Sequence, residues 1–234
     1  MPHPHIRVER DPAGFLRVAL ARQDRRNALD LSMVRALLAA FADEPAAPVV
    51  LGSADPRVFC AGADLAIPDA DRSAASDLLY ECYEVMITRP GAVIAVIAGA
   101  AVGGGAQLAT AADVRVAGPL ARFRWLGPPN PPLAVGAWVL PSLVGRAAAL
   151  ELTLTGRWLE AAEAADLGLV NRIDADPDQI AGRQAESLVA RGAEVVGRAK
   201  MIACAGGLLD RLHAERAANG AAWARMMSLT ADAE

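Results

Sequence analysis

Two glycine-containing segments of the chain carry the residue pattern most able to do chemistry. The first reads Phe-Cys-Ala-Gly-Ala-Asp-Leu over residues 59–65, and the second covers residues 99–108 and includes a glycine triplet at 103–105. A glycine turn that enters a helix leaves backbone N–H groups unpaired, and these can bind an acceptor oxygen. A single turn of this kind is also typical of close strand-to-helix packing and is weak evidence for a site. The prediction therefore depends on the two segments together. No Gly-Lys-Ser/Thr follows the triplet and the dinucleotide spacing is missing, which excludes the common phosphate loops. The pair therefore predicts an oxygen-binding site made of main-chain amides.

Side chains that usually act as nucleophiles or metal ligands are few. The three histidines lie near the two ends of the chain, and the three cysteines lack the spacing of metal ligands. The sequence contains no Gly-x-Ser-x-Gly that would supply a serine nucleophile. We therefore expect no metal site, no disulfide framework and no Ser-His or Cys-His pair.

Composition limits the partners and the compartment. The 234 residues carry a formal net charge of −4, and Lys200 is the single lysine, with no basic cluster along the chain. This charge pattern argues against a nucleic acid or an anionic membrane as a partner. The first twelve residues lack the apolar segment of a secretory signal. We therefore expect a cytoplasmic protein.

Residues 91–112 carry no charge and are long enough to cross a bilayer. Gly99 and the triplet at 103–105 would each weaken a continuous helix by about 1 kcal/mol relative to alanine. The β-branched run at 93–97 is typical of a short buried strand. We therefore predict a strand, a glycine turn and a helix, and no membrane span.

The elements that must position these segments alternate along the chain. The pattern predicts a hairpin of strands 6–9 and 15–20, a helix over 33–42 capped by Asp30 or Ser32, helices over 73–87 and 104–111, and strands 48–51, 93–97, 114–117, 122–124 and 169–173. Residues 56–65 are expected to form a loop, and prolines at 128–132 a second one. After residue 137 the chain is mostly helical. These elements indicate an α/β core over residues 1–174 and a helical region over 175–234.

Five segments, in order, resemble motifs of the crotonase family of enoyl-CoA hydratases and isomerases. They cover residues 25–29, 59–65, 99–115, 140–145 and 161–171. The resemblance implies a ClpP/crotonase-like α/β fold, a spiral of ββα units followed by a helical C-terminal region. Family members use that region to trimerise, so a homotrimer or a dimer of trimers is expected.

The resemblance further implies a site for an acyl-CoA thioester, with coenzyme A bound only as part of the substrate. Carried over to this chain, the N–H groups of Ala63 and Gly104 grip the thioester carbonyl. Enolate chemistry places negative charge on that oxygen, and one such donor contributes roughly 10²–10³ in rate. Further substrate contacts implied by matching positions are Arg26, Ala28, Ala61, Asp64, Leu65, Gly103 and Lys200. Between Phe123 and Trp138 the uncharged polar side-chain groups are the Asn130 amide and the indole N–H groups of Trp125 and Trp138, and Trp125 and Asn130 are further expected substrate contacts.

The chain departs from the family pattern where the hydratases keep two catalytic glutamates. The first position is Gln107, and a proline-rich loop of reduced length replaces the Pro-Glu pair that carries the second. An amide orients water but does not exchange protons near neutral pH. Glu81 and Glu84 are alternative proton-transfer groups, although their pattern is more typical of a solvated helix face. Asp64 and Asp113 are expected to cap backbone N–H groups.

Two functions remain open from the sequence. One is an enoyl-CoA hydratase or isomerase that acts through an enolate held by Ala63 and Gly104. The other is a non-catalytic acyl-CoA-binding or carrier protein of fatty-acid metabolism. A structural subunit of a hetero-oligomer is a third, weaker hypothesis. The missing glutamates favour the second function or a divergent chemistry.

Overall fold

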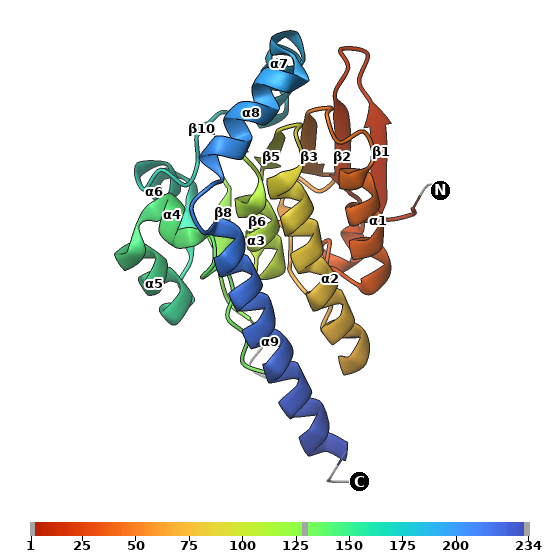
Figure 1. Cartoon of the computed structure of the whole chain (residues 1–234), viewed down its shortest axis with the longest axis vertical. Coiled ribbons are helices and arrows are strands. Elements are labelled where there is room, and N and C mark those ends of the chain that lie inside the picture. The colour runs from red at the N-terminus through yellow and green to blue at the C-terminus, as the bar shows by residue number, and fades with distance from the viewer. Residues whose placement is uncertain (1–2, 128–130, 232–234) are drawn as a thin grey trace.

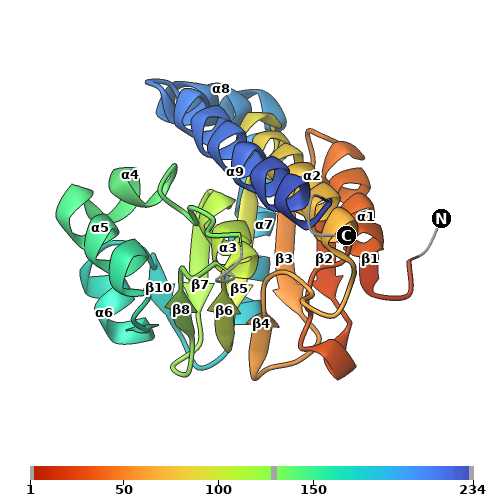
Figure 2. The same ribbon diagram turned by 90° about the horizontal axis from the view of Figure 1, so that it is seen from below.

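The computed structural model describes residues 3–127 and 131–231, and its strands form two sheets (Figure 1). The larger sheet has the strand order β1 (Ile6–Arg10), β2 (Leu16–Leu20), β3 (Val49–Ser53), β5 (Val93–Ile97), β7 (Val114–Ala117) and β10 (Arg172–Ile173). The smaller sheet has the order β4 (Val58–Cys60), β6 (Ala100–Val102), β8 (Arg122–Arg124) and β9 (Leu159–Glu160). Figure 2 shows β4, β6 and β8 side by side below the larger sheet.

Helices follow the strands in a repeated order. The helices are α1 (Leu31–Ala42), α2 (Asp69–Thr88), α3 (Gly104–Ala111), α4 (Leu140–Val144), α5 (Arg146–Thr155), α6 (Ala161–Asp166), α7 (Pro177–Arg191), α8 (Ala193–Ala203) and α9 (Leu208–Ala231). The units β3-β4-α2 and β5-β6-α3 each add one parallel strand to each sheet before the helix. Each successive unit therefore extends both sheets by one strand, and the loops that leave β4 and β6 lie next to each other.

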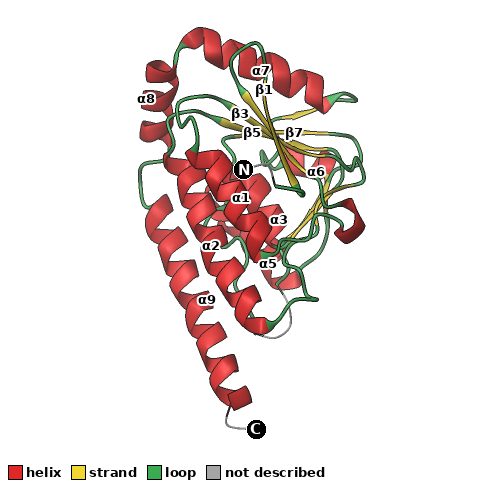
Figure 3. Ribbon diagram, turned by 90° about the vertical axis from the view of Figure 1, so that its right-hand side faces the viewer, coloured by secondary structure: helices red, strands yellow, loops and turns green. Residues whose placement is uncertain are grey.

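The long uncharged segment is accounted for by burial inside the protein. All five residues of β5 are buried, because this central parallel strand is covered by helices on both faces (Figure 3). The predicted strand over 93–97 and helix over 104–111 are both confirmed. In the described part of the chain no helix is long and apolar enough to cross a bilayer.

Most of the other expected elements are present, with differences at short strands and helix ends. The hairpin is confirmed, and the Asp30 side chain accepts a hydrogen bond from Met33 N at 2.8 Å, as the predicted cap of α1. The segment expected as a loop contains β4, and α2 starts at Asp69, four residues earlier than predicted. A strand of three residues such as β4 is too short to show an alternation of apolar and polar residues in the sequence. It forms because it pairs with β6.

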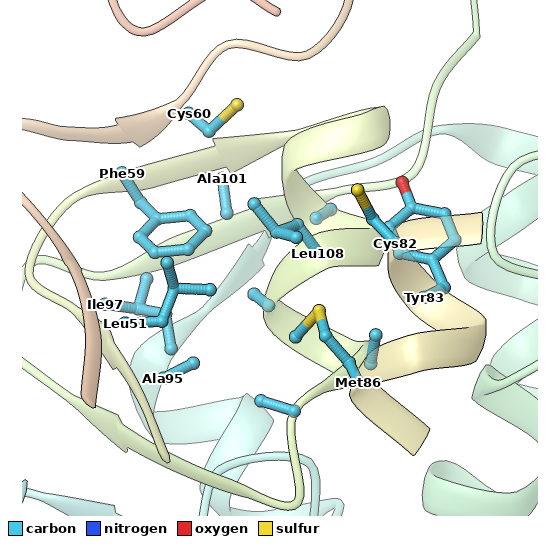
Figure 4. Packing of buried hydrophobic residues seen from close by; sticks show 14 of the residues in the cluster. Leu51, Phe59, Cys60, Cys82, Tyr83, Met86, Ala95, Ile97, Ala101 and Leu108 are labelled. Carbon is cyan, nitrogen blue, oxygen red and sulfur yellow. The ribbon is translucent and has the colours of Figure 1, made fainter. Parts of the chain in front are cut away.

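The main core lies between the sheets and α1, α2 and α3. Figure 4 shows Phe59, Ala101 and Leu108 on one side of this cluster, and Tyr83 and Met86 of α2 on the other. The thiols of Cys60 and Cys82 are buried within it. Burial raises the pKa of Cys60 to about 12, so that thiol stays protonated at neutral pH.

The C-terminal helices pack on the rest of the chain from two sides. Helix α7 covers the face of the larger sheet opposite α1 and α2 (Figure 3), in an apolar cluster formed by Phe15, Val50, Ile94, Val96, Val116, Ile180, Ala181 and Ala185. Helix α9 lies along α2 (Figure 1). In each of the two apolar clusters, residues from both sides of the predicted boundary at 174 pack together.

Candidate active site

A cavity of about 310 Å³ lies between α2, the start of α3 and the second half of α9. Its wall is mainly apolar. The polar or aromatic side chains on it are Arg72, Ser76, Tyr80, Tyr83, Gln107, Asn219 and Trp223. Among the described residues of the wall there is no aspartate or glutamate. The cavity is therefore suited to an apolar chain that carries a few hydrogen-bonding groups.

The loop after β4 brings the Ala63 N–H to this cavity. Leu29 N donates to Gly62 O at 2.7 Å, and Asp64 N donates to Leu29 O at 3.0 Å. This short parallel bridge uses the groups on either side of Ala63 and turns the N–H of Ala63 away from Leu29. Within the described residues that N–H donates no hydrogen bond.

The first turn of α3 brings a second N–H to the same place. Gly103 precedes the helix with φ 54°, a conformation that favours glycine, and it gives α3 no side-chain cap. Gly104 N, the first of the helix, has no acceptor in the part of the chain that the structure describes. Tyr83 Oη donates to Gly104 O at 3.0 Å and fixes the following peptide.

The two loops are in contact. A Cβ atom placed on Gly62 would lie 2.8 Å from Val102 O and 3.4 Å from Gly104 N. Only a glycine therefore allows the backbone of the first loop to approach the second this closely. Two unpaired N–H groups at one end of a cavity form a site for an oxygen that gains negative charge.

Gln107 lies on the cavity wall, one turn into α3. Its side chain is buried, and its Oε1 accepts a hydrogen bond from Trp138 Nε1 at 2.7 Å. This contact fixes the amide, and its NH₂ end faces the Tyr80 hydroxyl. The side chain that stands at the first expected glutamate position is thus an oriented donor and not a proton-transfer group.

A buried carboxylate that the sequence did not single out lies behind this wall. Glu215 of α9 accepts hydrogen bonds from Tyr80 Oη at 2.8 Å, Gly136 N at 3.2 Å and Trp138 N at 3.0 Å. Burial raises the pKa of Glu215, and these donors oppose the increase. Asn219, one turn later, donates to Tyr80 Oη at 2.8 Å. Together they tie α2 and the loop at 134–138 to α9.

Replacing Glu215 by glutamine is expected to lower stability by about 1 kcal/mol and to flatten its pH dependence. The pKa of Glu215 in the folded chain lies above the ordinary value of 4.5. Such a group favours folding below its unfolded pKa, and that contribution is lost as the pH rises through the folded pKa. The stability advantage of the wild type over Glu215→Gln should therefore shrink as the pH rises from about 4.5.

Urea unfolding at a series of pH values measures this difference. Glu186→Gln on α7, at an exposed glutamate, serves as the control. Parallel pH profiles for the wild type and Glu215→Gln would show that burial does not perturb this carboxyl.

The structure brings most of the expected main-chain site together. Ala61, Ala63, Leu65, Gly103, Gly104 and Gln107 all line the cavity. Arg26 and Ala28 do not, and Arg26 is exposed beside the fully buried Asn27. The Asn27 amide donates to Phe59 O at 3.0 Å, so this residue supports the loop that carries Ala63. Asn130 lies outside the described residues.

Three expected substrate contacts, Asp64, Trp125 and Lys200, form contacts within the protein. The Asp64 carboxylate pairs with Arg22 at 2.8 Å, and the buried Trp125 stacks on Phe123. Lys200 is buried, and its Nζ lies 2.8 Å from Asp113 Oδ2. None of the three lines this cavity, and Lys200 lines a separate pocket beside Asp113.

The alternative proton-transfer groups on α2 face α9 and form ion pairs. Glu81 pairs with Arg216 at 2.9 Å, and Glu84 contacts His213 at 3.0 Å. Neither glutamate lines the cavity, in keeping with the solvated helix face that their pattern favours.

Comparisons with known proteins show the family to which the chain belongs. The sequence profile described as enoyl-CoA hydratase/isomerase matches residues 10–220. The chain belongs to this family. A probable mitochondrial enoyl-CoA hydratase of Arabidopsis thaliana is 37% identical over 179 residues, and the match covers 70% of this chain but only 58% of that relative. A probable enoyl-CoA hydratase of Mycobacterium leprae is 38% identical over 176 residues, which is 70% of each chain.

The fold agrees with solved structures of the enoyl-CoA hydratase/isomerase family. An enoyl-CoA hydratase from Bacillus anthracis superposes with a TM-score of 0.79 at 28% identity, covering 92% of this chain and 90% of that one. The predicted α/β fold of ββα units with C-terminal helices is therefore confirmed.

Proposed function

We propose that the protein binds an acyl-CoA thioester and holds its carbonyl oxygen between the N–H groups of Ala63 and Gly104. The observation that carries this proposal is the meeting of two unpaired main-chain donors at one end of an apolar cavity. An acyl chain fits the apolar wall, and the thioester oxygen meets the donors. Coenzyme A enters as part of the substrate. The trimeric state and the cytoplasmic compartment stay predictions from the sequence.

We further propose that ordinary hydration of enoyl thioesters is absent or very slow. The described wall offers no carboxylate to activate water, and the Gln107 amide is held by Trp138. Tyr80 is no substitute, since its proton is donated to Glu215 and burial raises its pKa further above the neutral range. Losing one acid/base group costs about 10²–10⁴ in rate. Binding or delivery of the thioester is therefore favoured over hydratase turnover.

Calorimetry with butyryl-CoA and a steady-state hydration assay with crotonyl-CoA test both parts. We expect butyryl-CoA to bind and crotonyl-CoA to be hydrated near the uncatalysed rate. Absence of binding at high micromolar concentrations of the thioester would contradict the site. Turnover at ordinary enzyme rates of about 1–10³ s⁻¹ would contradict the proposed loss of hydration and favour the hydratase hypothesis.

Replacing Gly62 by alanine is expected to weaken butyryl-CoA binding by at least about tenfold. The new Cβ would lie 2.8 Å from Val102 O at a residue whose φ is 87°, so the loop carrying Ala63 must move away from α3. Gly145→Ala is the matched control, because Gly145 also has a positive φ, 76°, but has no atom within 4 Å of its added Cβ. Calorimetry on both folded variants measures the effect. Equal affinity for Gly62→Ala and the wild type would show that this loop does not form the oxygen site.

A further inference from the structure

Two residues of the cavity wall each carry a buried N–H group that has no acceptor within the described residues. These groups are Nε of Arg72 on α2 and Nε1 of Trp223 on α9. Trp223 is 3% exposed, and the Arg72 side chain is 13% exposed. The other unpartnered buried side-chain atoms of the described part belong to Trp125 and Gln184, which do not line this cavity. Buried donors in native proteins are nearly always paired, so two on one wall indicate an acceptor that the chain itself does not supply.

The two donors form one cluster across the gap between α2 and α9. The guanidinium carbon of Arg72 lies 5.3 Å from the centroid of the Trp223 ring. Arg72 Nη2 is paired with Asp69, whose carboxylate is about half exposed. That pairing engages one corner of the guanidinium, and Nε remains without a partner among the described residues. An indole N–H donates only, so both groups require an acceptor atom.

This cluster lies at the opposite end of the cavity from the oxygen site. A Cβ atom on Gly104 would lie 2.9 Å from Leu79 Cδ2. Leu79 of α2 therefore lies beside Gly104, one of the two unpaired main-chain donors. Arg72 is seven residues earlier on the same helix, or about 10 Å along its axis at 1.5 Å per residue. Apolar wall residues, Ala75 and Leu79, lie between. A thioester held by Ala63 and Gly104 would therefore direct the far end of its acyl chain toward Arg72 and Trp223.

We propose that the cavity takes acyl-CoA thioesters whose acyl chain ends in a carboxylate, and that Arg72 and Trp223 bind this carboxylate. The inference rests on the proposed acyl-CoA site and adds the class of acyl group. A carboxylate supplies acceptor oxygens for both donors and forms a charge-assisted hydrogen bond with the guanidinium. An alkyl end would leave both buried donors unpaired, and sites built around polar groups discriminate strongly against such ligands.

Calorimetry on the wild type tests the preference. Glutaryl-, adipoyl- and suberoyl-CoA are each compared with the alkyl thioester of equal length, pentanoyl-, hexanoyl- and octanoyl-CoA. At the best-fitting length we expect the carboxylate-ended thioester to bind at least about tenfold more tightly. Alkyl thioesters that bind as tightly or more tightly at all three lengths would overturn the inference. Absence of binding by all six would instead contradict the proposed function itself.

Two variants assign the preference to these donors. Arg72→Met keeps the apolar stem and removes the guanidinium, and Trp223→Phe keeps the ring packing and removes the N–H. We expect Arg72→Met to abolish the preference and Trp223→Phe to reduce it, with the preference measured within each variant as the ratio of its affinities for the carboxylate-ended and the alkyl thioester of equal length. Arg198→Met on α8, at an arginine side chain that is 66% exposed, is the control. Full preference retained in both Arg72→Met and Trp223→Phe would overturn the assignment.

Discussion

Replacing Gln107 by glutamate is expected to raise the rate of crotonyl-CoA hydration by about 10²-fold over the wild type. Gln107 Oε1 already accepts a hydrogen bond from Trp138 Nε1, and a carboxylate at this position accepts the same bond. Its second oxygen then replaces the NH₂ group on the wall of the cavity. Burial raises the pKa of such a carboxyl toward neutrality, where it exchanges protons with water most effectively. A single general acid or base contributes a factor of about 10²–10⁴ to the rate, and we expect the lower end of this range for one restored group.

Gln107→Ala provides the control for this gain. It removes the amide without adding a proton-transfer group, so its rate should stay near that of the wild type. The loss of enoyl absorbance measures turnover, and calorimetry with butyryl-CoA confirms that both variants still bind the thioester. Equal hydration rates for Gln107→Glu and Gln107→Ala would show that this position is not where the proton transfer fails.

The main-chain part of the candidate site was predictable because each of its two loops consists of residues that are contiguous in the sequence. A glycine in the first loop and a glycine triplet at the start of a helix are local signals, and both loops are found at the cavity. The strand over 93–97 and the helix over 104–111 also have the predicted bounds, whereas the short strand β6 (Ala100–Val102) directly before the triplet was not predicted. Backbone donors need no particular side chain, so Ala63 could be assigned from its position in the pattern alone.

The side chains of α9 that lie on the cavity wall or support it were missed, because their positions depend on tertiary packing. Glu215, Asn219 and Trp223 are spaced by four residues and therefore share one face of α9, a periodicity that the sequence does contain. No local sequence signal indicates that this face of α9 contacts Tyr80, which lies 135 residues before Glu215. The place of α9 on the cavity wall thus depends on how two helices that are distant in sequence pack.

Position within a motif likewise does not establish what a charged side chain contacts. Lys200 matches a place where relatives often keep a basic group, and it was expected near the nucleotide of coenzyme A. Its ammonium is buried, with Met86 O at 2.5 Å and Asp113 Oδ2 at 2.8 Å. The pairing has an electrostatic reason, because the Asp113 carboxylate, which follows α3 and is 20% exposed, is stabilised by a cation beside it. Asp113, expected to cap backbone groups, does accept a hydrogen bond from Val93 N at 2.7 Å.

Replacing Lys200 by methionine is expected to lower the free energy of unfolding by about 3–5 kcal/mol. Methionine keeps much of the length of the side chain but leaves the Asp113 carboxylate without its closest cation. Burial raises the pKa of Asp113, and Lys200 is the largest factor that opposes this increase. For a chain of this size the loss corresponds to a decrease in Tm of roughly 6–20 °C.

The double variant Asp113→Asn, Lys200→Met separates the unpaired charge from lost packing. The amide oxygen introduced at position 113 still accepts the hydrogen bond from Val93 N, and no charge is left buried, so most of the stability should return. Arg198→Met on the same helix, at an exposed arginine, is the control and should change stability by less than about 0.5 kcal/mol. Urea unfolding measures all four proteins. A Lys200→Met variant within about 1 kcal/mol of the wild type would mean that water or the neighbouring Arg115 neutralises Asp113, and that Lys200 is free for another role.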